Sequence, residues 1–163
     1  MLKRIETLAN VSIIVVSLLL GTILVKRYVL SPASASQPTP PKAGSRVNLP
    51  DVDWRSKRQT VLVVLKPGCH FCSASAPFYS RLSEEAARKE IQLVAVLQEP
   101  VGVSQAYLSE QKIPIAAVRQ ADLSALNVRG TPTVLLVDRN GLLVRAWTGK
   151  LTPDGEAELL KML

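Results

Sequence analysis

Short apolar runs alternate with polar, helix-forming segments along residues 59–163. Residues 60–65 and 91–97 are rich in Val and Leu, which predicts strands that are buried on both faces. Residues 73–90, between them, have the Ala, Leu, Glu and Arg composition that favours a helix. Further elements are predicted along the chain, a helix at 103–111, a short strand at 115–119 and a helical turn at 123–126. This order of elements indicates an α/β domain.

The last thirty or so residues carry a second pattern. Two apolar runs, residues 133–137 and 142–147, flank Asp138-Arg139-Asn140-Gly141, and Asn-Gly between two such runs is a hairpin signal. Thr152 suits the N-cap of a helix and Pro153 its first position, which predicts a closing helix at residues 153–163.

An uncharged apolar stretch occupies residues 11–25, with Lys3 and Arg4 before it and Lys26-Arg27 after it. With its flanks it approaches the length that spans a bilayer, which predicts a transmembrane anchor at residues 11–30 after a flank at residues 1–10. The alternative is a cleaved signal peptide, because Ala33-Ser34-Ala35 fits a cleavage pattern. That site lies well beyond the apolar run and behind two basic residues, which favours the uncleaved anchor.

Residues 31–46 are rich in Pro, Ser and Ala, which predicts an extended linker, and residues 47–163 have a suitable length for one domain. The net charge of +7 divides unevenly, since residues 1–58 carry nine basic and three acidic side chains and the remainder eleven and ten. The excess belongs to the membrane flanks and the linker. No basic motif interleaved with aromatic residues is present, so nucleic acid is excluded as a partner. The protein is expected to be a monomer.

The two cysteines of the chain occur in Cys69-His70-Phe71-Cys72, directly after the first predicted strand. At a strand-to-helix junction the helix amino end stabilises a thiolate on the first cysteine, which predicts Cys69 as the attacking thiol and Cys72 as the resolving thiol. A structural zinc site usually needs four Cys or His ligands, and this chain has two Cys and one His. Haem attachment requires a His directly after the second cysteine, where this chain has Ser73. A purely structural disulfide stays open, although its loop is too short to constrain the unfolded chain strongly.

A second motif, Gly130-Thr131-Pro132-Thr133, leads directly into an apolar strand, where a proline cannot donate to the sheet. Residues 47–163 resemble the thioredoxin-like superfamily in four features. These are the two motifs, Pro77 after the cysteines and Gly149 after the hairpin. Within this superfamily the chain is most similar to the membrane-anchored, TlpA-like or redoxin branch of bacterial thiol-disulfide oxidoreductases. The resemblance implies that the Thr131-Pro132 bond is cis and faces the cysteines. It also implies that the Thr131 main chain pairs with an extended substrate segment.

The same resemblance implies a central mixed sheet flanked by helices, preceded by one transmembrane helix. It implies exchange with protein thiols or disulfides, with no metal or cofactor, and a membrane electron donor as a further partner. The anchor is expected in the inner membrane and the redox domain on its periplasmic side, where the cytosolic thiol pools do not dominate.

Several residues depart from the thioredoxin pattern. Gly68 precedes the first cysteine, His70-Phe71 replaces Gly-Pro, and Val63 stands where thioredoxins bury an aspartate. His70 is predicted to stabilise the Cys69 thiolate and so to make the disulfide more oxidising. Whether the protein acts as a reductase or an oxidase stays open.

Three other functions are weighed on the same fold. A peroxiredoxin requires Thr or Ser three residues before its reactive cysteine, where this chain has Lys66. A copper-handling protein requires a distant His, and the single His lies between the cysteines. A non-catalytic binding module is the third, because a fold does not by itself imply a function.

Overall fold

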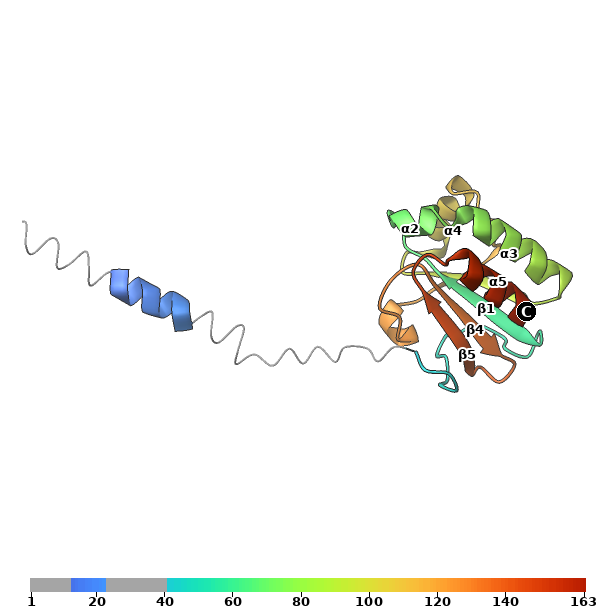
Figure 1. The fold of residues 1–163 in the computed structure, drawn as a ribbon, viewed down its shortest axis with the longest axis horizontal. Helices are drawn as coiled ribbons and strands as arrows, with labels where there is room; N and C mark the ends of the chain where they lie inside the picture. The colour runs from blue at the N-terminus through green and yellow to red at the C-terminus, as the bar shows by residue number, and fades with distance from the viewer. Residues whose placement is uncertain (1–12, 23–40) are drawn as a thin grey trace, which may run out of the picture. The chain divides into compact units, whose positions relative to one another are not determined.

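The fold is described from a computed structural model, which covers residues 13–22 and 41–163 as two separate units (Figure 1). Residues 13–22 form a helix whose Ile, Val and Leu side chains are exposed. The predicted flank at residues 1–10, the ends of the predicted anchor and most of the predicted linker lie outside the described residues. Over the two described ranges, no helix has both the length and the apolar character that crossing a membrane requires.

A five-stranded mixed sheet in the order β3-β2-β1-β4-β5 organises the second unit. Its strands are β1 (Gln59–Val64), β2 (Gln92–Leu97), β3 (Ala117–Gln120), β4 (Thr133–Asp138) and β5 (Leu143–Thr148). The first three strands run parallel, and β4 and β5 form an antiparallel hairpin beside β1. The predicted mixed sheet is confirmed.

Strand β1 lies at the centre of the sheet and is buried on both faces. Val61 and Val63 face one apolar core and Leu62 and Val64 the other, and none of the four is exposed. This explains why its sequence is a continuous apolar run rather than an alternating one.

Three helices cover one face of the sheet, α3 (Ala76–Arg88), α4 (Val101–Glu110) and α5 (Pro153–Met162), and all three contribute to the same core (Figure 1). The chain steps from β1 to β2 to β3 in one direction along the sheet. Because parallel crossovers are right-handed, α3 and α4 must lie on the same side. Thr152 caps α5 by accepting a hydrogen bond from the Gly155 N–H, as predicted.

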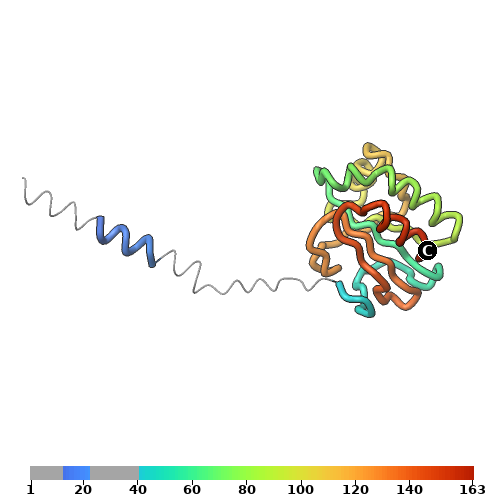
Figure 2. The backbone as a smooth tube through the Cα atoms, in the orientation of Figure 1, coloured from blue at the N-terminus to red at the C-terminus, as the bar shows by residue number. Residues whose placement is uncertain are grey.

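Irregular chain covers the opposite face. Residues 47–54 and the short helix η2 (Leu123–Leu126) supply Val47, Leu49 and Leu126 to a second core. Figure 2 shows the chain from residue 41 onward running beside the end of the β4–β5 hairpin. There the Gly44 N–H donates to Leu143 O (2.7 Å) and the Val47 N–H to Gly141 O (2.9 Å).

The helix predicted at residues 73–90 is interrupted, which corrects the sequence-based prediction. It consists of α2 (His70–Ser73) and, after a turn, α3. Pro77 explains the interruption, because it has no N–H to donate to the Ser73 carbonyl and its ring would clash there. Ser75 becomes the N-cap of α3, and its hydroxyl donates to Phe71 O at 2.8 Å.

Gly141 follows Asn140 in the hairpin turn and adopts a φ of 76°. A Cβ at this position would lie 3.2 Å from Trp54 Cδ1. We expect Gly141→Ala to lower the free energy of unfolding by about 1–2 kcal/mol, because the backbone conformation disfavours a side chain and Trp54 must shift. Urea unfolding followed by circular dichroism would measure the loss.

Gly102→Ala is the matched control. Gly102 lies in α4 and a Cβ there meets no atom within 4 Å. Removing backbone freedom from the unfolded chain should stabilise the protein by about 0.5 kcal/mol. Equal effects of the two substitutions would contradict the assignment of strain to Gly141.

Asp138 ends β4 and organises the hairpin turn. Its Oδ1 accepts hydrogen bonds from the Leu142 N–H (2.9 Å) and the Asn140 N–H (2.8 Å). The bond from Leu142, followed by that from Asn140, lowers the pKa of this carboxyl below its ordinary value of 3.8.

This pKa predicts how stability depends on pH. The pKa of Asp138 is lower in the folded state than in the unfolded state. The carboxylate therefore stabilises the fold fully at pH above the unfolded pKa, and this stabilisation is lost as the pH falls through the folded pKa. We expect Asp138→Asn to reduce the loss of stability below about pH 4, compared with Asp122→Asn at an exposed site. Urea midpoints across the acid range would show it, and identical profiles would contradict it.

Candidate active site

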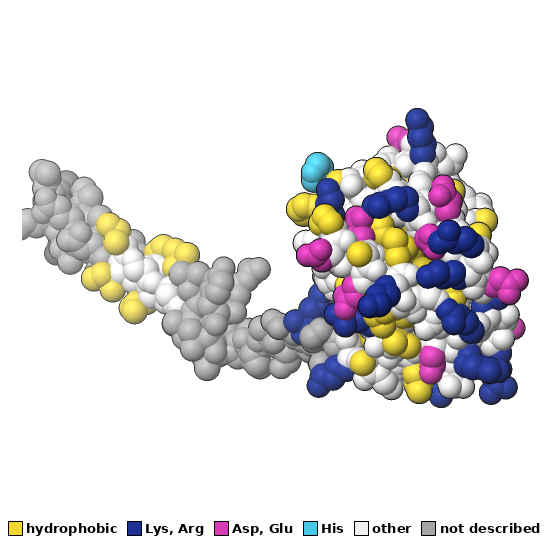
Figure 3. Space-filling model, turned by 45° about the vertical axis from the view of Figure 1, so that its right-hand side comes forward, with side chains coloured by type: hydrophobic (Ala, Val, Ile, Leu, Met, Phe, Trp, Pro, Cys, Tyr) yellow, Lys and Arg dark blue, Asp and Glu magenta, His cyan; other side chains and the backbone are white. Residues whose placement is uncertain are grey.

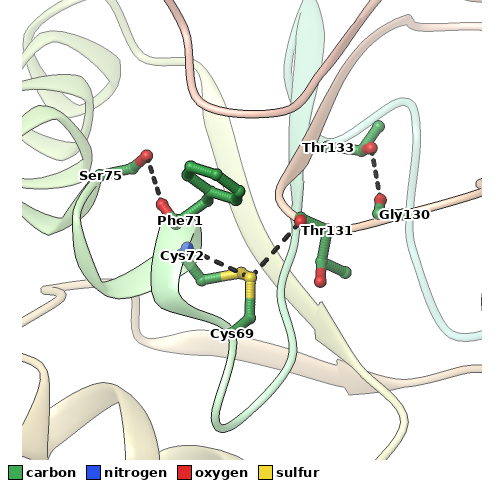
Figure 4. The surroundings of a disulfide bond; sticks show 7 residues. All are labelled: Cys69, Phe71, Cys72, Ser75, Gly130, Thr131 and Thr133. Carbon is green, nitrogen blue, oxygen red and sulfur yellow. Dashed lines mark hydrogen bonds between the residues drawn. A yellow bond between two sulfur atoms is a disulfide. The ribbon is translucent and has the colours of Figure 1, made fainter.

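Cys69 begins α2 at the carboxyl end of the central strand β1. Gly68, with a φ of 74°, turns the chain after Leu65 so that Cys69 becomes the N-cap residue. Figure 4 shows the loop, with both cysteines facing the segment that contains Thr131.

A disulfide joins Cys69 and Cys72, whose Cα atoms lie 5.3 Å apart. Cys69 is partly exposed, whereas Cys72 is fully buried and belongs to the helix-covered core. A thiol from another protein can therefore approach the sulfur of Cys69 and not that of Cys72. This asymmetry matches the roles predicted for the attacking and the resolving thiol.

Polar backbone groups surround the Cys69 sulfur. The Cys72 N–H points at Cys69 Sγ (3.3 Å) as well as at Cys69 O (3.0 Å). The Thr131 carbonyl oxygen lies 3.4 Å from Cys69 Sγ, a distance at which the reduced thiol would donate a hydrogen bond to it (Figure 4). An N–H directed at the sulfur stabilises a thiolate there.

The Thr131-Pro132 peptide bond is cis, as the resemblance implied. This segment lies at the start of β4, where Thr133 pairs with Val64 of β1, so the sheet register brings it beside the cysteine loop. Thr133 Oγ1 donates to Gly130 O (2.8 Å), and the Gly149 N–H donates to Pro132 O (2.7 Å). These bonds hold the Thr131 carbonyl toward Cys69.

His70 and Phe71 project from the loop into solvent. The two rings pack edge to face with centroids 5.6 Å apart, and Phe71 is 57% exposed. Figure 3 shows the single histidine on the surface at the upper left of the domain. His70 therefore stands at the rim of the site, and its predicted effect on the Cys69 thiolate stays a prediction.

From the sequence, Glu99-Pro100 is interpreted as a strand-end turn, with a position bordering the thiols as the alternative. Glu99 follows β2, the parallel neighbour of β1, and thus lies at the same edge of the sheet as the cysteine loop. Its Oε2 atom is buried with no hydrogen-bond partner among the described residues. Nearby Tyr107 is largely buried, and this burial raises the pKa of its hydroxyl. The rule that neighbouring parallel strands end at one edge was the available signal.

Val63, which stands where thioredoxins bury an aspartate, lies fully buried in β1 within the helix-covered core. Over residues 13–22 and 41–163, no cluster of three or more His, Cys, Asp or Glu side chains has the geometry to hold a metal ion.

The thioredoxin-like domain family matches residues 51–163, more than half of the chain. The chain belongs to the thioredoxin-like family. No curated protein matches it. This thioredoxin-like domain is similar to a putative thiol:disulfide interchange protein DsbE from Chlorobium tepidum, at 23% identity and a TM-score of 0.60, covering 75% of this chain and 96% of that one.

Two further solved structures share the thioredoxin-like fold. One is a putative protein disulfide isomerase from Bacteroides thetaiotaomicron, at 19% identity and a TM-score of 0.59, covering 75% of this chain and 87% of that one. The other is a secreted Mycobacterium tuberculosis disulfide oxidoreductase homologous to E. coli DsbE, at 23% identity and a TM-score of 0.51, covering 65% and 82%. At these identities the likeness establishes the fold.

Proposed function

We propose that this protein is a thiol-disulfide oxidoreductase that exchanges electrons with protein thiols and disulfides through Cys69 and Cys72. The observation that carries the proposal is the asymmetry of the pair, since an accessible sulfur faces the Thr131 carbonyl at 3.4 Å and a fully buried sulfur lies behind it. A purely structural disulfide requires neither feature.

The reaction follows from this arrangement. In the reducing direction the Cys69 thiolate attacks a partner disulfide, forms a mixed disulfide and releases one partner thiolate. The Cys72 thiolate then attacks Cys69 Sγ and releases the second partner thiolate, which takes up a proton. Two electrons pass to the partner and the Cys69–Cys72 disulfide remains. The reverse sequence oxidises a partner dithiol.

The partner chain is expected to dock beside the accessible sulfur. The Thr131 main chain offers polar groups to an extended segment, and the exposed ring of Phe71 offers apolar contact at the rim of the site. Both groups flank Cys69, so a docked cysteine would meet the reactive sulfur.

The domain is proposed to act outside the cytoplasm, tethered to the inner membrane by residues 11–30 with the redox domain on the periplasmic side. The uncharged apolar stretch at residues 11–25 supports the tether. One of the similar structures is a secreted Mycobacterium tuberculosis disulfide oxidoreductase, which supports the compartment. A transmembrane electron donor is the expected source of electrons if the protein is a reductase.

Redox titration of the full chain in glutathione or dithiothreitol buffers tests the proposal. A reversible two-electron couple is expected, together with catalysed reduction or oxidation of a model disulfide protein such as insulin. A potential near −270 mV would indicate a reductase and one near −120 mV an oxidant, as for thioredoxin and for strong periplasmic oxidants. No reversible couple would contradict the proposal and leave a structural disulfide.

His70 is expected to shift this potential. If its ring stabilises the Cys69 thiolate, His70→Ala destabilises the reduced form and makes the couple more reducing by about 30 mV, which is roughly tenfold in the exchange equilibrium. Phe71→Ala, at the adjacent exposed position, is the matched control for changes in loop packing. An unchanged potential in His70→Ala would remove His70 from the site.

A further inference from the structure

Six basic side chains lie around the end of the sheet opposite the cysteines. The register explains the gathering, because Gln59 at the amino end of β1 pairs with Asp138 at the carboxyl end of β4. The residues before β1 therefore meet the β4–β5 turn and the segment before β2. We call this group the basic pole, and it consists of Arg46, Arg55, Lys57, Arg58, Lys89 and Arg139.

The basic pole surrounds two open hollows of about 380 and 330 Å³. Asp53 and Glu90 are the acidic side chains among the residues that line them, against six basic ones. The surface is therefore hollowed and positively charged.

The charge of the domain is concentrated at this pole. From residue 41 onward the chain has sixteen basic and twelve acidic residues, a surplus of four. The lining of the two hollows has the same surplus, and a surplus of three remains when Asp138, at the same end of the sheet, is counted, so most of the excess lies at the pole. A diffuse positive surface would not produce this distribution.

The charges at the pole are not neutralised by ion pairs. The ion pairs Arg81–Glu156, Arg88–Glu85 and Arg145–Glu158 lie elsewhere, and no basic side chain of the pole forms one with another described residue. Two nearby carboxylates, Asp53 and Asp138, instead accept hydrogen bonds from backbone N–H groups. Lys89 Nζ donates to Leu160 O (2.9 Å) and Arg46 Nη1 to Asn140 O (3.2 Å). The basic side chains of the pole that remain available to an external anion are Arg55, Lys57, Arg58 and Arg139.

We propose that the basic pole docks on the surface of an anionic phospholipid bilayer. Charge complementarity favours this partner, because each Lys or Arg near an anionic bilayer strengthens binding by roughly fivefold. The position of the first described residues of the domain favours it too, since Arg46, near the start of the described range 41–163, lies at this pole. There Arg46 Nη1 donates to Asn140 O at 3.2 Å, and the backbone of Arg46 forms an isolated antiparallel β-bridge with Leu142. The inference rests on the membrane tether of the proposed function.

Docking at the basic pole would orient the active site. Strand β1 runs from this pole to the cysteine loop, and its six residues span about 20 Å. Cys69 would then face the aqueous space, away from the lipid headgroups. A tethered domain docked in this way presents its reactive sulfur to soluble or protruding partner proteins.

The two tryptophans provide the test. Trp54 lies at the basic pole and Trp147 near the opposite end of β5, beside Val134. The full chain is reconstituted in phosphatidylcholine vesicles containing a headgroup nitroxide lipid, with or without phosphatidylglycerol. Single-tryptophan variants, Trp147→Phe and Trp54→Phe, separate the two signals. We expect quenching of Trp54 and not of Trp147, with phosphatidylglycerol required and salt near 0.5 M abolishing it.

Charge reversal supplies the matched control. Arg58→Glu with Arg139→Glu at the basic pole should lower the ratio of docked to undocked domain by at least about 30-fold. Lys66→Glu with Lys150→Glu changes the net charge equally at exposed positions beside the active site and should leave the ratio unchanged. Equal Trp54 quenching with neutral lipid, or equal loss in both variants, would overturn the proposal.

The failure of this proposal is distinguishable from failure of the tether or of the chemistry. Flotation of the vesicles reports insertion of the chain, and disulfide exchange is assayed on the same samples. A chain that floats and exchanges disulfides without Trp54 quenching would overturn the docking proposal alone.

Discussion

Cys69→Ser is expected to abolish disulfide exchange, lowering the rate by about a thousandfold or more, because the nucleophile is removed while the domain still folds. Cys72→Ser should act differently. Cys69 remains accessible and can attack, but nothing resolves the mixed disulfide, so partner proteins accumulate covalently on Cys69. Non-reducing gels of cells or extracts that contain each variant would show the two patterns.

The comparison between these variants is its own control. Each removes one sulfur of the same disulfide and leaves the other as a free thiol. Covalent adducts on both variants in equal amounts would contradict the assignment of roles, since Cys72 is fully buried. Full exchange activity in Cys69→Ser would contradict the function itself.

Leu82→Ala carries the second large expected effect. Leu82 lies on α3 with no exposed surface and packs in the core between the helices and the sheet. Truncation removes buried apolar surface and leaves a cavity, which costs about 3 kcal/mol of unfolding free energy. The thermal midpoint, followed by circular dichroism, should fall by roughly 10 °C.

Glu84→Ala, two residues along the same helix, is the control for this prediction. Glu84 is exposed, and replacing it changes helix propensity little, so the stability should change by less than about 0.5 kcal/mol. A loss as large as that of Leu82→Ala would mean that the helix itself, rather than the core, limits stability.

The strands and the hairpin could be predicted from the sequence because their signals are local. Apolar runs at residues 60–65 and 91–97 and the Asn-Gly turn require no knowledge of distant residues, and the structure confirms each element within one or two positions. The η2 turn was placed at the residues where it occurs. Family resemblance identified Pro77 as a kinking proline, but the complete break between α2 and α3 was not predicted, because the surrounding composition favours a continuous helix.

The meeting of Cys69 and Thr131 could not be derived from a local pattern, since 62 residues separate them. Family resemblance implied it, and the pairing of Val64 with Thr133 now explains it. The basic pole was missed for the same reason. Arg55, Lys57 and Arg58 lie together before β1 in the sequence and are interpreted from it as solvated surface, with contact to anionic headgroups as the alternative, and Arg139 joins them only once the sheet forms.

The pairing of β1 with β4 also determines how the active site responds to local opening of the domain. Both strands are interior to the sheet, and the cysteine loop and the Thr131-Pro132 segment both extend from one end of this pair. Interior strands usually open only when the whole domain unfolds, whereas edges such as β3 with α4 fray at lower cost. Substitutions along the β3 edge are therefore expected to be tolerated while the two halves of the reactive centre stay aligned.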